Sequence, residues 1–452
     1  MRKRPIFAIL LLALLVRCGF LYKNWDNLDL ASSFLLHAEV ARNILNNHWF
    51  EKNQSYLNAY IRACYDQQKL LDPADFPPPQ TEALAPLYND EGGYGLLLAA
   101  LWKLFGTHRW WYIRVLQILL DVLMCWLVYR IGREAFHERT GIVAALLYAL
   151  FLPVVELAVR PHRDIWVTFL YITAAYLLVR NREVRTPLWQ FTLFGAAAAL
   201  VAWMRSTVVP FTLVLAVLFF TFKPPKEAVR CAAAMMISFL VLFSPLVIRN
   251  YVVFDKFMVT RGAFWHSFWA GVGQMPNPYG LHEDDEEIAR FASKLDSSAK
   301  FETERYEQVL KQEAIVFVSS NPLWYAGSIL KRAAVIVFPK VGRALFFQET
   351  PTQHVSGTHN RLLSQWVLLG ADVFLGGLFL WGLWRGKNQW KRLLVIVIPY
   401  LYTLVTLAPF YVAGRNIANG YYVVLLFSAY SLVLIWDKLK PRLFMKQPPV
   451  GV

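Results

Sequence analysis

Charge is scarce in this chain. Only 17% of its 452 residues are Asp, Glu, Lys or Arg, whereas 57% are hydrophobic and 15% are aromatic. A soluble protein of this size would carry charge on about a quarter of its residues, so this composition excludes a soluble protein. A bare bundle of helices is excluded too, because the remaining charge gathers in long polar loops. We therefore expect a membrane protein with sizeable loops.

Cysteine and metal-ligand patterns are also sparse. Of the four cysteines, Cys18, Cys64, Cys125 and Cys231, only Cys64 lies clearly in a loop, and they form neither a disulfide framework nor a metal-ligand spacing. The histidines show no pair at i and i+4 beside a glutamate. No metal or cofactor is predicted, although a divalent cation at the acidic residues stays open.

Long apolar runs dominate what is present. About ten segments, each roughly 15–20 residues, are long enough to cross the hydrocarbon core of a membrane. They cover residues 6–20, 111–129, 142–158, 165–179, 191–204, 208–222, 232–248, 363–384, 393–407 and 421–436. No small-residue cleavage site follows the first segment, so we interpret it as an uncleaved span rather than a signal peptide.

Basic residues flank these segments and predict their orientation. Six clusters of Lys and Arg lie at residues 2–4, 130–139, 180–185, 223–230, 385–392 and 438–442. Placing all six in the cytoplasm satisfies the positive-inside rule and requires an even number of crossings with both termini inside. This orientation accounts for the net charge of +15, so nucleic-acid binding is not expected.

The predicted fold is a mainly α, polytopic transmembrane helical bundle of about ten spans, with two large extracytoplasmic loops that carry amphipathic helices. The first span covers residues 1–20, the first loop 21–110, spans two to seven 111–248, the second loop 249–360, and the last three spans with a cytoplasmic tail 361–452. Loops of this length are usually functional or separately folded. We expect loop helices at 34–45, at 94–105 along the membrane interface, and over 288–319.

Several short motifs carry a resemblance. Ala38-Glu39-Val40-Ala41 opens the segment 38–45, and the segments 101–106, 128–133, 195–205 and 244–251 follow in order. Each motif is weak alone, but together with the topology they cover most of the chain. In this order they resemble membrane glycosyltransferases of the GT-C type, in particular the bacterial protein-mannosyltransferase and aminoarabinose-transferase group.

The resemblance implies an activity and a location. Such enzymes take a sugar from a polyprenyl-phosphate carrier and pass it to a glycan, lipid or protein acceptor. The chain would then be an integral protein, surrounded by membrane lipids, of the bacterial inner (plasma) membrane, with its active site facing the periplasm. One departure stands out: the family usually has an acidic pair before the first-loop helix, where this chain has Ser33 and Phe34, and His37 replaces a common aromatic.

Inverting sugar transfer needs a general base that takes a proton from the acceptor, and we expect a carboxylate in this role. The candidates on the outer side are Asp26, Asp29, Glu39, Asp90 and Glu91. Asp90 and Glu91 stand close to where the family often carries a second acid. Each of the five could instead be a solvated residue of a turn or helix surface.

The leaving lipid phosphate needs cationic stabilisation. The candidates are Arg160, His162, Arg163, Arg205, Arg249 and Arg415. The positive-inside rule disfavours arginines on the extracytoplasmic side of the membrane. Bidentate binding of a phosphate would explain their presence there. Interfacial anchoring and ion pairs within the protein are the alternatives. Asp164 could fill the place of an acid that commonly opens the family's fourth span, or could pair with a neighbouring arginine.

Two other functions stay open. Asp121 and Asp372 fall inside predicted spans, as in a transporter or flippase of lipid-linked glycans. The missing acid pair also fits a catalytically inactive member. An enzyme should gather carboxylates and arginines in one outward cavity, whereas a transporter should line a path through its centre. The lack of repeated halves in the sequence counts against a transporter.

Overall fold

The computed structural model describes residues 4–27, 35–76, 84–88, 90–180, 187–347 and 361–444. Within these ranges the protein is almost entirely helical, which confirms the predicted mainly α fold. The described strands, β1 (Glu51–Asn53) and β2 (Leu84–Pro86), pair antiparallel in the first loop.

Each predicted span coincides with a helix or a bent pair of helices. They are α1 (Arg4–Lys23), α5 (Trp111–Ala135), α6 (Glu138–Leu150) with α7 (Leu152–Val159), α8 (Asp164–Arg180), α9 (Leu188–Ala202), α10 (Val208–Phe222), α11 (Pro225–Phe254), α17 (Arg361–Gly386), α18 (Trp390–Leu407) and α20 (Tyr421–Phe444). Among the described residues, five helices are long and apolar enough to cross a membrane, or six if the bent pair counts as one. The predicted number of ten is not confirmed, because the other helices fall short of the length of a full span.

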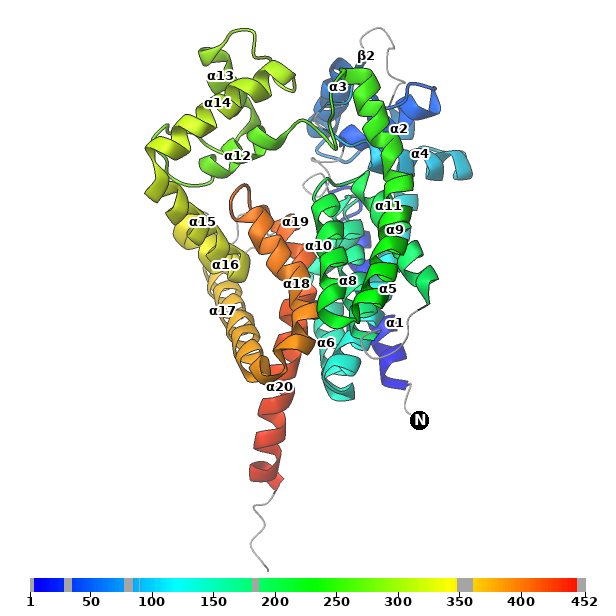
Figure 1. The fold of residues 1–452 in the computed structure, drawn as a ribbon, viewed down its shortest axis with the longest axis vertical. Helices are drawn as coiled ribbons and strands as arrows, with labels where there is room; N and C mark the ends of the chain where they lie inside the picture. The colour runs from blue at the N-terminus through cyan, green and yellow to red at the C-terminus, as the bar shows by residue number, and fades with distance from the viewer. Residues whose placement is uncertain are drawn as a thin grey trace, which may run out of the picture.

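Most of the loop helices lie at one end of the molecule, whereas α15 (Pro322–Val337) and α16 (Pro339–Gly342) run down beside α17 and α18 (Figure 1). The first loop contributes α2 (Leu35–Leu45), α3 (Gln54–Asp66), a short helix at Pro73–Asp75, and α4 (Gly93–Phe105). The second contributes α12 (Phe264–Gly273), α13 (Asp285–Leu295), α14 (Glu304–Ser320), α15 (Pro322–Val337), α16 (Pro339–Gly342) and the turn Arg343–Phe347. The short elements Lys387–Gln389, α19 (Gly414–Ile417) and Ala418–Gly420 complete the fold. The N-terminal end of α1 and the last turns of α20 both lie toward the opposite end from the loop helices (Figure 1).

The predicted loop helices are largely confirmed. α2 and α4 match the expected helices, and the expected helix over 288–319 is divided into α13 and α14. The polar stretch after residue 53 forms α3, whose N-terminus is capped by the side chain of Asn53 accepting from the Tyr56 amide at 3.0 Å. Each loop has its own apolar core, and Trp102 and Trp269 are among the largest buried side chains. Each loop therefore folds as a packed unit.

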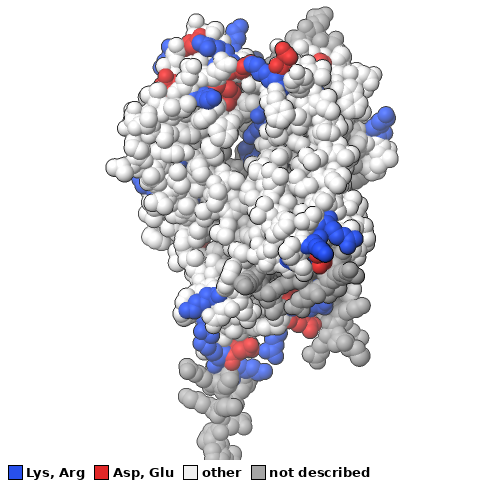
Figure 2. Space-filling model, viewed as in Figure 1, with Lys and Arg blue, Asp and Glu red and all other residues white. Residues whose placement is uncertain are grey.

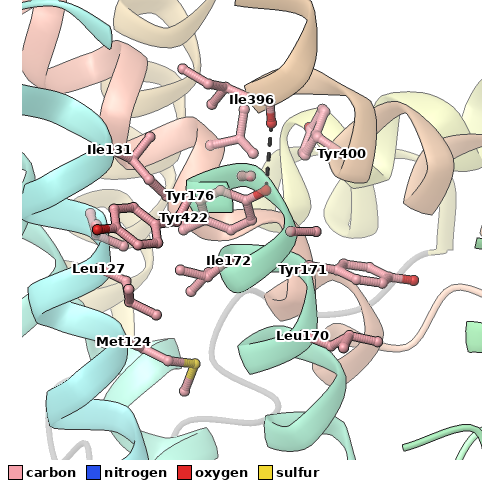
Figure 3. Packing of buried hydrophobic residues seen from close by; sticks show 14 of the residues in the cluster. Met124, Leu127, Ile131, Leu170, Tyr171, Ile172, Tyr176, Ile396, Tyr400 and Tyr422 are labelled. Atoms are coloured by element: carbon pink, nitrogen blue, oxygen red, sulfur yellow. Dashed lines mark hydrogen bonds between the residues drawn. The ribbon is translucent and has the colours of Figure 1, made fainter. Parts of the chain in front are cut away.

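The main core runs through the whole helical bundle, and one part of it lies between α5, α8, α18 and α20. Figure 3 shows Leu127 and Ile131 of α5 facing Ile172 and Tyr176 of α8. Tyr422 reaches into this packing from α20, and its hydroxyl lies 3.5 Å from the carbonyl oxygen of Ile396. This core fixes the relative position of the helices whose outer ends carry the polar residues described below.

The surface agrees with a protein embedded in lipid. Figure 2 shows Lys, Arg, Asp and Glu at the top, around the loop helices, and again lower down, with a largely uncharged belt between them on this face. Large apolar side chains are exposed on the candidate spans, among them Leu11, Leu240 and Phe374. Lipid tails stabilise such surface, whereas water does not. The chain is thus an integral membrane protein.

One buried ion pair holds the bent span together. The axes of α6 and α7 differ by 59°, and Pro153 near the start of α7 cannot donate a backbone hydrogen bond. Arg17 of α1 donates to the freed carbonyl of Ala149 at 2.6 Å and pairs with Asp121 of α5 at 2.5 Å. Tyr148 donates to the same carboxylate at 2.8 Å. Asp121 therefore has a structural partner on a neighbouring helix.

Candidate functional site

A glycine turn before α4 brings two carboxylates into the protein. Asp90 accepts a hydrogen bond from the amide of Gly92 at 2.9 Å. Gly92 has φ of +76°, and a Cβ there would come within 2.3 Å of the Phe50 ring, so only glycine fits. The Gly93 amide donates to the carbonyl of Trp203 at 2.9 Å, which ties the turn to the end of α9. The predicted alternative of a solvated turn is wrong, because the side chains of Asp90 and Glu91 are 8% and 0% exposed.

Arg163, in the loop between α7 and α8, binds both carboxylates. Its Nη1 lies 2.7 Å from Asp90 Oδ2 and 3.1 Å from Glu91 Oε2. Burial opposes the charge of Asp90, but Arg163 and the other nearby cations outweigh it and hold the pKa of Asp90 well below its usual range. Burial also opposes the charge of Arg163, and the carboxylates in turn raise its pKa. Both groups are therefore charged at neutral pH.

Glu91 has two further partners. Its Oε1 accepts a hydrogen bond from the Ser206 amide at 2.8 Å and lies 3.6 Å from Nε of Arg261. Ser206 follows α9, and Arg261 belongs to the second loop. This glutamate therefore joins the first loop, the membrane bundle and the second loop.

A second carboxylate centre forms around Asp164, the first residue of α8. Its Oδ1 lies 3.6 Å from Nε of Arg205, and its Oδ2 lies 4.0 Å from Nε of Arg415 and 3.2 Å from Nδ1 of His162. Arg205 also donates to Oδ1 of Asn416 at 2.9 Å. Burial lowers the pKa of His162 well below its usual range, so this imidazole is neutral.

These residues form one arginine–carboxylate cluster. It contains Asp90, Glu91, Asp164, Arg163, Arg205, Arg261 and Arg415. Four guanidinium groups face three carboxylates, which leaves an excess charge of +1. The members come from the first loop, the second loop, the start of α8, the residues after α9, and α19.

Several buried atoms of the cluster make no hydrogen bond. Among the described residues, Nε of Arg163, Nε of Arg415 and both carboxylate oxygens of Asp164 are buried without a hydrogen bond. Buried polar atoms are nearly always bonded, and exceptions mark sites for water, ions or ligands. The cluster therefore has the charge and the free donors to bind an anion.

Two of the other predicted carboxylates, Asp26 and Glu39, have partners outside the cluster. Asp26 is half exposed and lies 4.0 Å from Nζ of Lys69. Asp29 lies outside the described residues. Glu39 is buried elsewhere, where it accepts hydrogen bonds from the side chain of Asn43 at 2.8 Å and from the amide of Asn53. Burial raises the pKa of Glu39 to about 7, which these bonds only partly oppose. Its contacts join α2 to β1 and α3.

Two predicted cations are also occupied elsewhere. Arg249 donates to the carbonyls of Leu87 and Phe50 at 3.1 Å and 3.0 Å, so it anchors the first loop to the end of α11. Arg160 pairs with Glu156 one turn earlier on α7, at 2.6 Å. The cluster thus brings together Arg163, Arg205 and Arg415, with His162 beside them, but not Arg160 or Arg249.

Sequence reasoning missed Arg261 and underrated His37. Nothing in the sequence around Arg261 distinguishes it from other loop arginines, because its contact with Glu91 depends on how the two loops dock. His37 of α2 is 2% exposed and packs edge-on against Tyr94, with ring centroids 5.0 Å apart. The sequence did contain one sign that His37 is unusual, since it stands where the resembling family commonly has an aromatic residue.

The remaining intramembrane acid has a structural role as well. Asp372 of α17 accepts hydrogen bonds from the amides of Lys340 and Val341 at 2.9 Å and 3.0 Å, at the start of α16. A carboxylate at a helix N-terminus is a common stabilising arrangement. Among the described residues, no group of three His, Cys, Asp or Glu could hold a metal ion.

Comparison with known proteins agrees with this architecture. Residues 93–248, about a third of the chain, match the family model of dolichyl-phosphate-mannose-protein mannosyltransferase. This segment runs from α4 to α11 and contains three of the seven cluster residues, Arg163, Asp164 and Arg205. A search of curated proteins gave no match.

Solved structures match over nearly the whole chain. The crystal structure of the Archaeoglobus fulgidus oligosaccharyltransferase in the apo form has a TM-score of 0.53 at 15% identity, covering 99% of this chain and 53% of that one. The oligosaccharyltransferase AglB from the same organism, in complex with an inhibitory peptide and a dolichol-phosphate, has a TM-score of 0.52 at 14% identity with the same coverage. The chain therefore spans about half the length of these structures and shares the fold of that half. The predicted resemblance to GT-C type glycosyltransferases is confirmed.

Proposed function

We propose that this chain is an integral-membrane glycosyltransferase that transfers a sugar from a polyprenyl-phosphate donor to an acceptor on the extracytoplasmic face. The arginine–carboxylate cluster is the observation that carries the proposal. It gathers acids and guanidiniums from both loops and from the segments that connect the membrane helices, which supports an enzyme. The family-model match and the dolichol-phosphate named for a structure of the same fold support the donor class.

Each part of the cluster has a role in this reaction. Arg205, just after α9, and Arg415, in α19 between α18 and α20, bind the donor phosphate. In the proposed orientation both segments face the outer side of the membrane, where the donor's headgroup would lie. Asp164 lies between the two arginines and orients their guanidinium groups. Its Oδ1 is 3.6 Å from Nε of Arg205, and its Oδ2 is 4.0 Å from Nε of Arg415. Asp90 and Glu91 hold Arg163 at the other side of the cluster. Guanidiniums fixed before the substrate arrives can stabilise the charge that develops on the leaving phosphate.

Release of lipid phosphate tests the activity. Purified protein would be incubated with a panel of radiolabelled polyprenyl-phosphate sugars and an acceptor extract, alongside the double variant Arg205→Ala/Arg415→Ala. We expect one or more donors to be consumed by the wild type and not by the variant. Equal, background-level consumption by both proteins across the panel would contradict the proposal and favour an inactive member.

A transporter or flippase of lipid-linked glycans is the alternative. The contacts of Asp121 with Arg17 and of Asp372 with the start of α16 disfavour it, because both acids are engaged in structural bonds. In reconstituted vesicles, movement of a labelled lipid-linked glycan without cleavage of its phosphate–sugar bond would support this alternative.

We further propose that both termini are cytoplasmic, that residues 21–110 and 249–360 are extracytoplasmic, and that the protein resides in a bacterial inner membrane with its active site facing the periplasm. Cys64 cannot report this orientation, because it is fully buried. Ser297 and Lys226 are exposed. In a variant lacking Cys18, a membrane-impermeant thiol reagent should label Ser297→Cys in intact spheroplasts and Lys226→Cys only after permeabilisation. The reverse pattern would overturn the orientation.

A further inference from the structure

His37 is a buried side chain beside the arginine–carboxylate cluster that the roles above leave unused. Its Nδ1 is buried and has no hydrogen-bond partner among the described residues. The charged groups that act on it are Asp90, Arg163, Asp164 and Arg415, all of them members of the cluster. A buried imidazole nitrogen without a hydrogen bond, close to a polar cluster, is suited to meet a substrate atom.

The packing of α2 fixes this imidazole. Its ring lies edge-on to Tyr94 of α4, and the hydroxyl of Tyr94 donates to Oε1 of Gln117 on α5 at 2.8 Å. Gln117 donates in turn to the carbonyl of Arg160 at 2.8 Å, just before the loop that carries Arg163. A continuous series of contacts therefore links His37 to the loop that carries Arg163.

The carboxylates of the cluster are poorly suited to take a proton. Asp90 and Glu91 both bond Arg163, and Glu91 also accepts from the amide of Ser206. Asp164 has two guanidinium nitrogens within 4.0 Å, which favour its charged form. Glu39 lies on the same helix as His37 but bonds Asn43 and Asn53. Both bonds are made by Oε1 of Glu39, at the contact of α2 with β1 and α3, and among the described residues no member of the cluster is one of its partners.

We infer that His37 is the catalytic base of the sugar transfer, accepting the proton of the acceptor hydroxyl. The inference rests on the proposed function. In the step, the acceptor oxygen bonds to the anomeric carbon while its proton passes to the imidazole. The bond from that carbon to the phosphate oxygen breaks, and its electron pair leaves with the polyprenyl phosphate. The donor diester carries one negative charge, and the products are an imidazolium and a lipid phosphate of charge −2, so charge balances.

The protonation state fits this role. Burial, together with Arg163 and Arg415, lowers the pKa of His37 to about 4, although Asp90 and Asp164 partly oppose the shift. The imidazole is therefore neutral at pH 7 and can accept a proton. The imidazolium formed in the step faces the departing phosphate dianion, and this negative charge stabilises the protonated histidine. The phosphate can then take the proton and restore the neutral imidazole.

The first test compares matched substitutions. His37→Gln preserves size and hydrogen bonding but cannot take the proton, so kcat should fall by about 10²- to 10⁴-fold while donor binding is retained. His37→Glu should recover at least tenfold over the Gln variant, because a carboxylate can act as a base. His48→Gln is the matched control, since His48 is more than a third exposed and faces Glu51 at 3.4 Å. A His37→Gln variant within threefold of wild type would overturn the inference.

Two further measurements separate this role from a structural one. The acidic limb of the wild-type pH–rate profile should be absent from the residual activity of His37→Gln, and its persistence would count against His37. If His37→Gln misfolds and loses donor binding, the test uses the His37→Ala variant instead, and turnover is measured with and without added imidazole. Restored turnover supports the base, and absence of any restoration contradicts it.

Asp29 is the competing candidate for the catalytic base, and the variants of Asp29 and His37 distinguish the two assignments. Asp29→Asn should retain turnover, whereas a loss in Asp29→Asn with full activity in His37→Gln would transfer the role to Asp29. Failure of wild-type protein to consume any donor would sink the proposed function itself. An active wild type with an active His37→Gln variant would sink only the inference about His37.

Discussion

Arg163 bonds both Asp90 and Glu91 through one nitrogen, with Nη1 2.7 Å from Asp90 Oδ2 and 3.1 Å from Glu91 Oε2. The arrangement joins the first loop to the start of α8, and all three side chains are nearly buried. A buried charge network of this kind contributes more to the positions of the loops than to net stability, because desolvation offsets most of the attraction.

Removing Arg163 should therefore be severe. Arg163→Met leaves two carboxylates without their shared partner, and we expect a loss of about 3–5 kcal/mol in the free energy of unfolding. The triple variant Arg163→Met/Asp90→Asn/Glu91→Gln should regain much of this stability but no activity. Unfolding in detergent, followed by tryptophan fluorescence, measures the difference. A single variant as stable as wild type would show that the network is solvated rather than buried.

Arg205 and Arg415 should govern donor binding. Each Arg→Ala change removes a charge-assisted bond to phosphate worth on the order of 1.5–3 kcal/mol, or roughly ten- to a hundredfold in affinity. Lysine keeps the charge but loses the planar fork, so Arg→Lys should weaken binding less. Binding of a labelled polyprenyl-phosphate sugar is the measurement. Arg139→Ala is the control, because Arg139 is exposed and pairs with Asp437 on another surface. Alanine variants within twofold of wild type would refute the assignment.

The sequence predicted the helices well, because they depend on local patterns. The apolar run at 208–222 coincides with α10, and the Gly-Tyr-Gly-Leu segment after the glycine turn begins α4 where an interfacial helix was expected. The bend between α6 and α7 was missed, because it depends on Pro153 together with Arg17 from a distant helix. A periodic apolar pattern does not reveal such a partner.

The site was predicted only in part, for a related reason. Position along the chain shows that Arg249 and Arg205 both follow a span, but only the docked loops decide that Arg249 bonds backbone carbonyls while Arg205 faces Asp164. Glu39 similarly looks exposed in a helical pattern, yet α2 is buried over nearly its whole length. Partners of charged groups are set by tertiary contacts, which the sequence alone does not give.

Glu39 should make stability depend on pH. Its pKa rises from about 4.3 in the unfolded chain to about 7 in the folded protein, mainly through burial. The folded state therefore holds the proton more tightly, so this stabilising contribution is complete below about pH 4 and is lost as pH rises through 7. The loss is on the order of 1–3 kcal/mol. The wild-type Tm should fall between about pH 4 and pH 7 relative to Glu39→Gln, whose amide does not titrate, and should level off above pH 7. Parallel Tm curves for the two proteins would contradict the assignment.

Arg17 and Asp121 should prove to be a structural pair and not a transport pathway. Arg17→Met leaves the Asp121 carboxylate buried without its cation and also removes the donor to the carbonyl of Ala149, so a loss of about 3–5 kcal/mol is expected. The double variant Arg17→Met/Asp121→Leu should regain most of that loss, because apolar side chains can replace a buried ion pair. Sugar transfer should follow stability across the series, since Arg17 also supports the bend that leads into the Arg163 loop. A proton-coupled transporter would behave differently: Asp121→Asn would fold normally yet lose all activity.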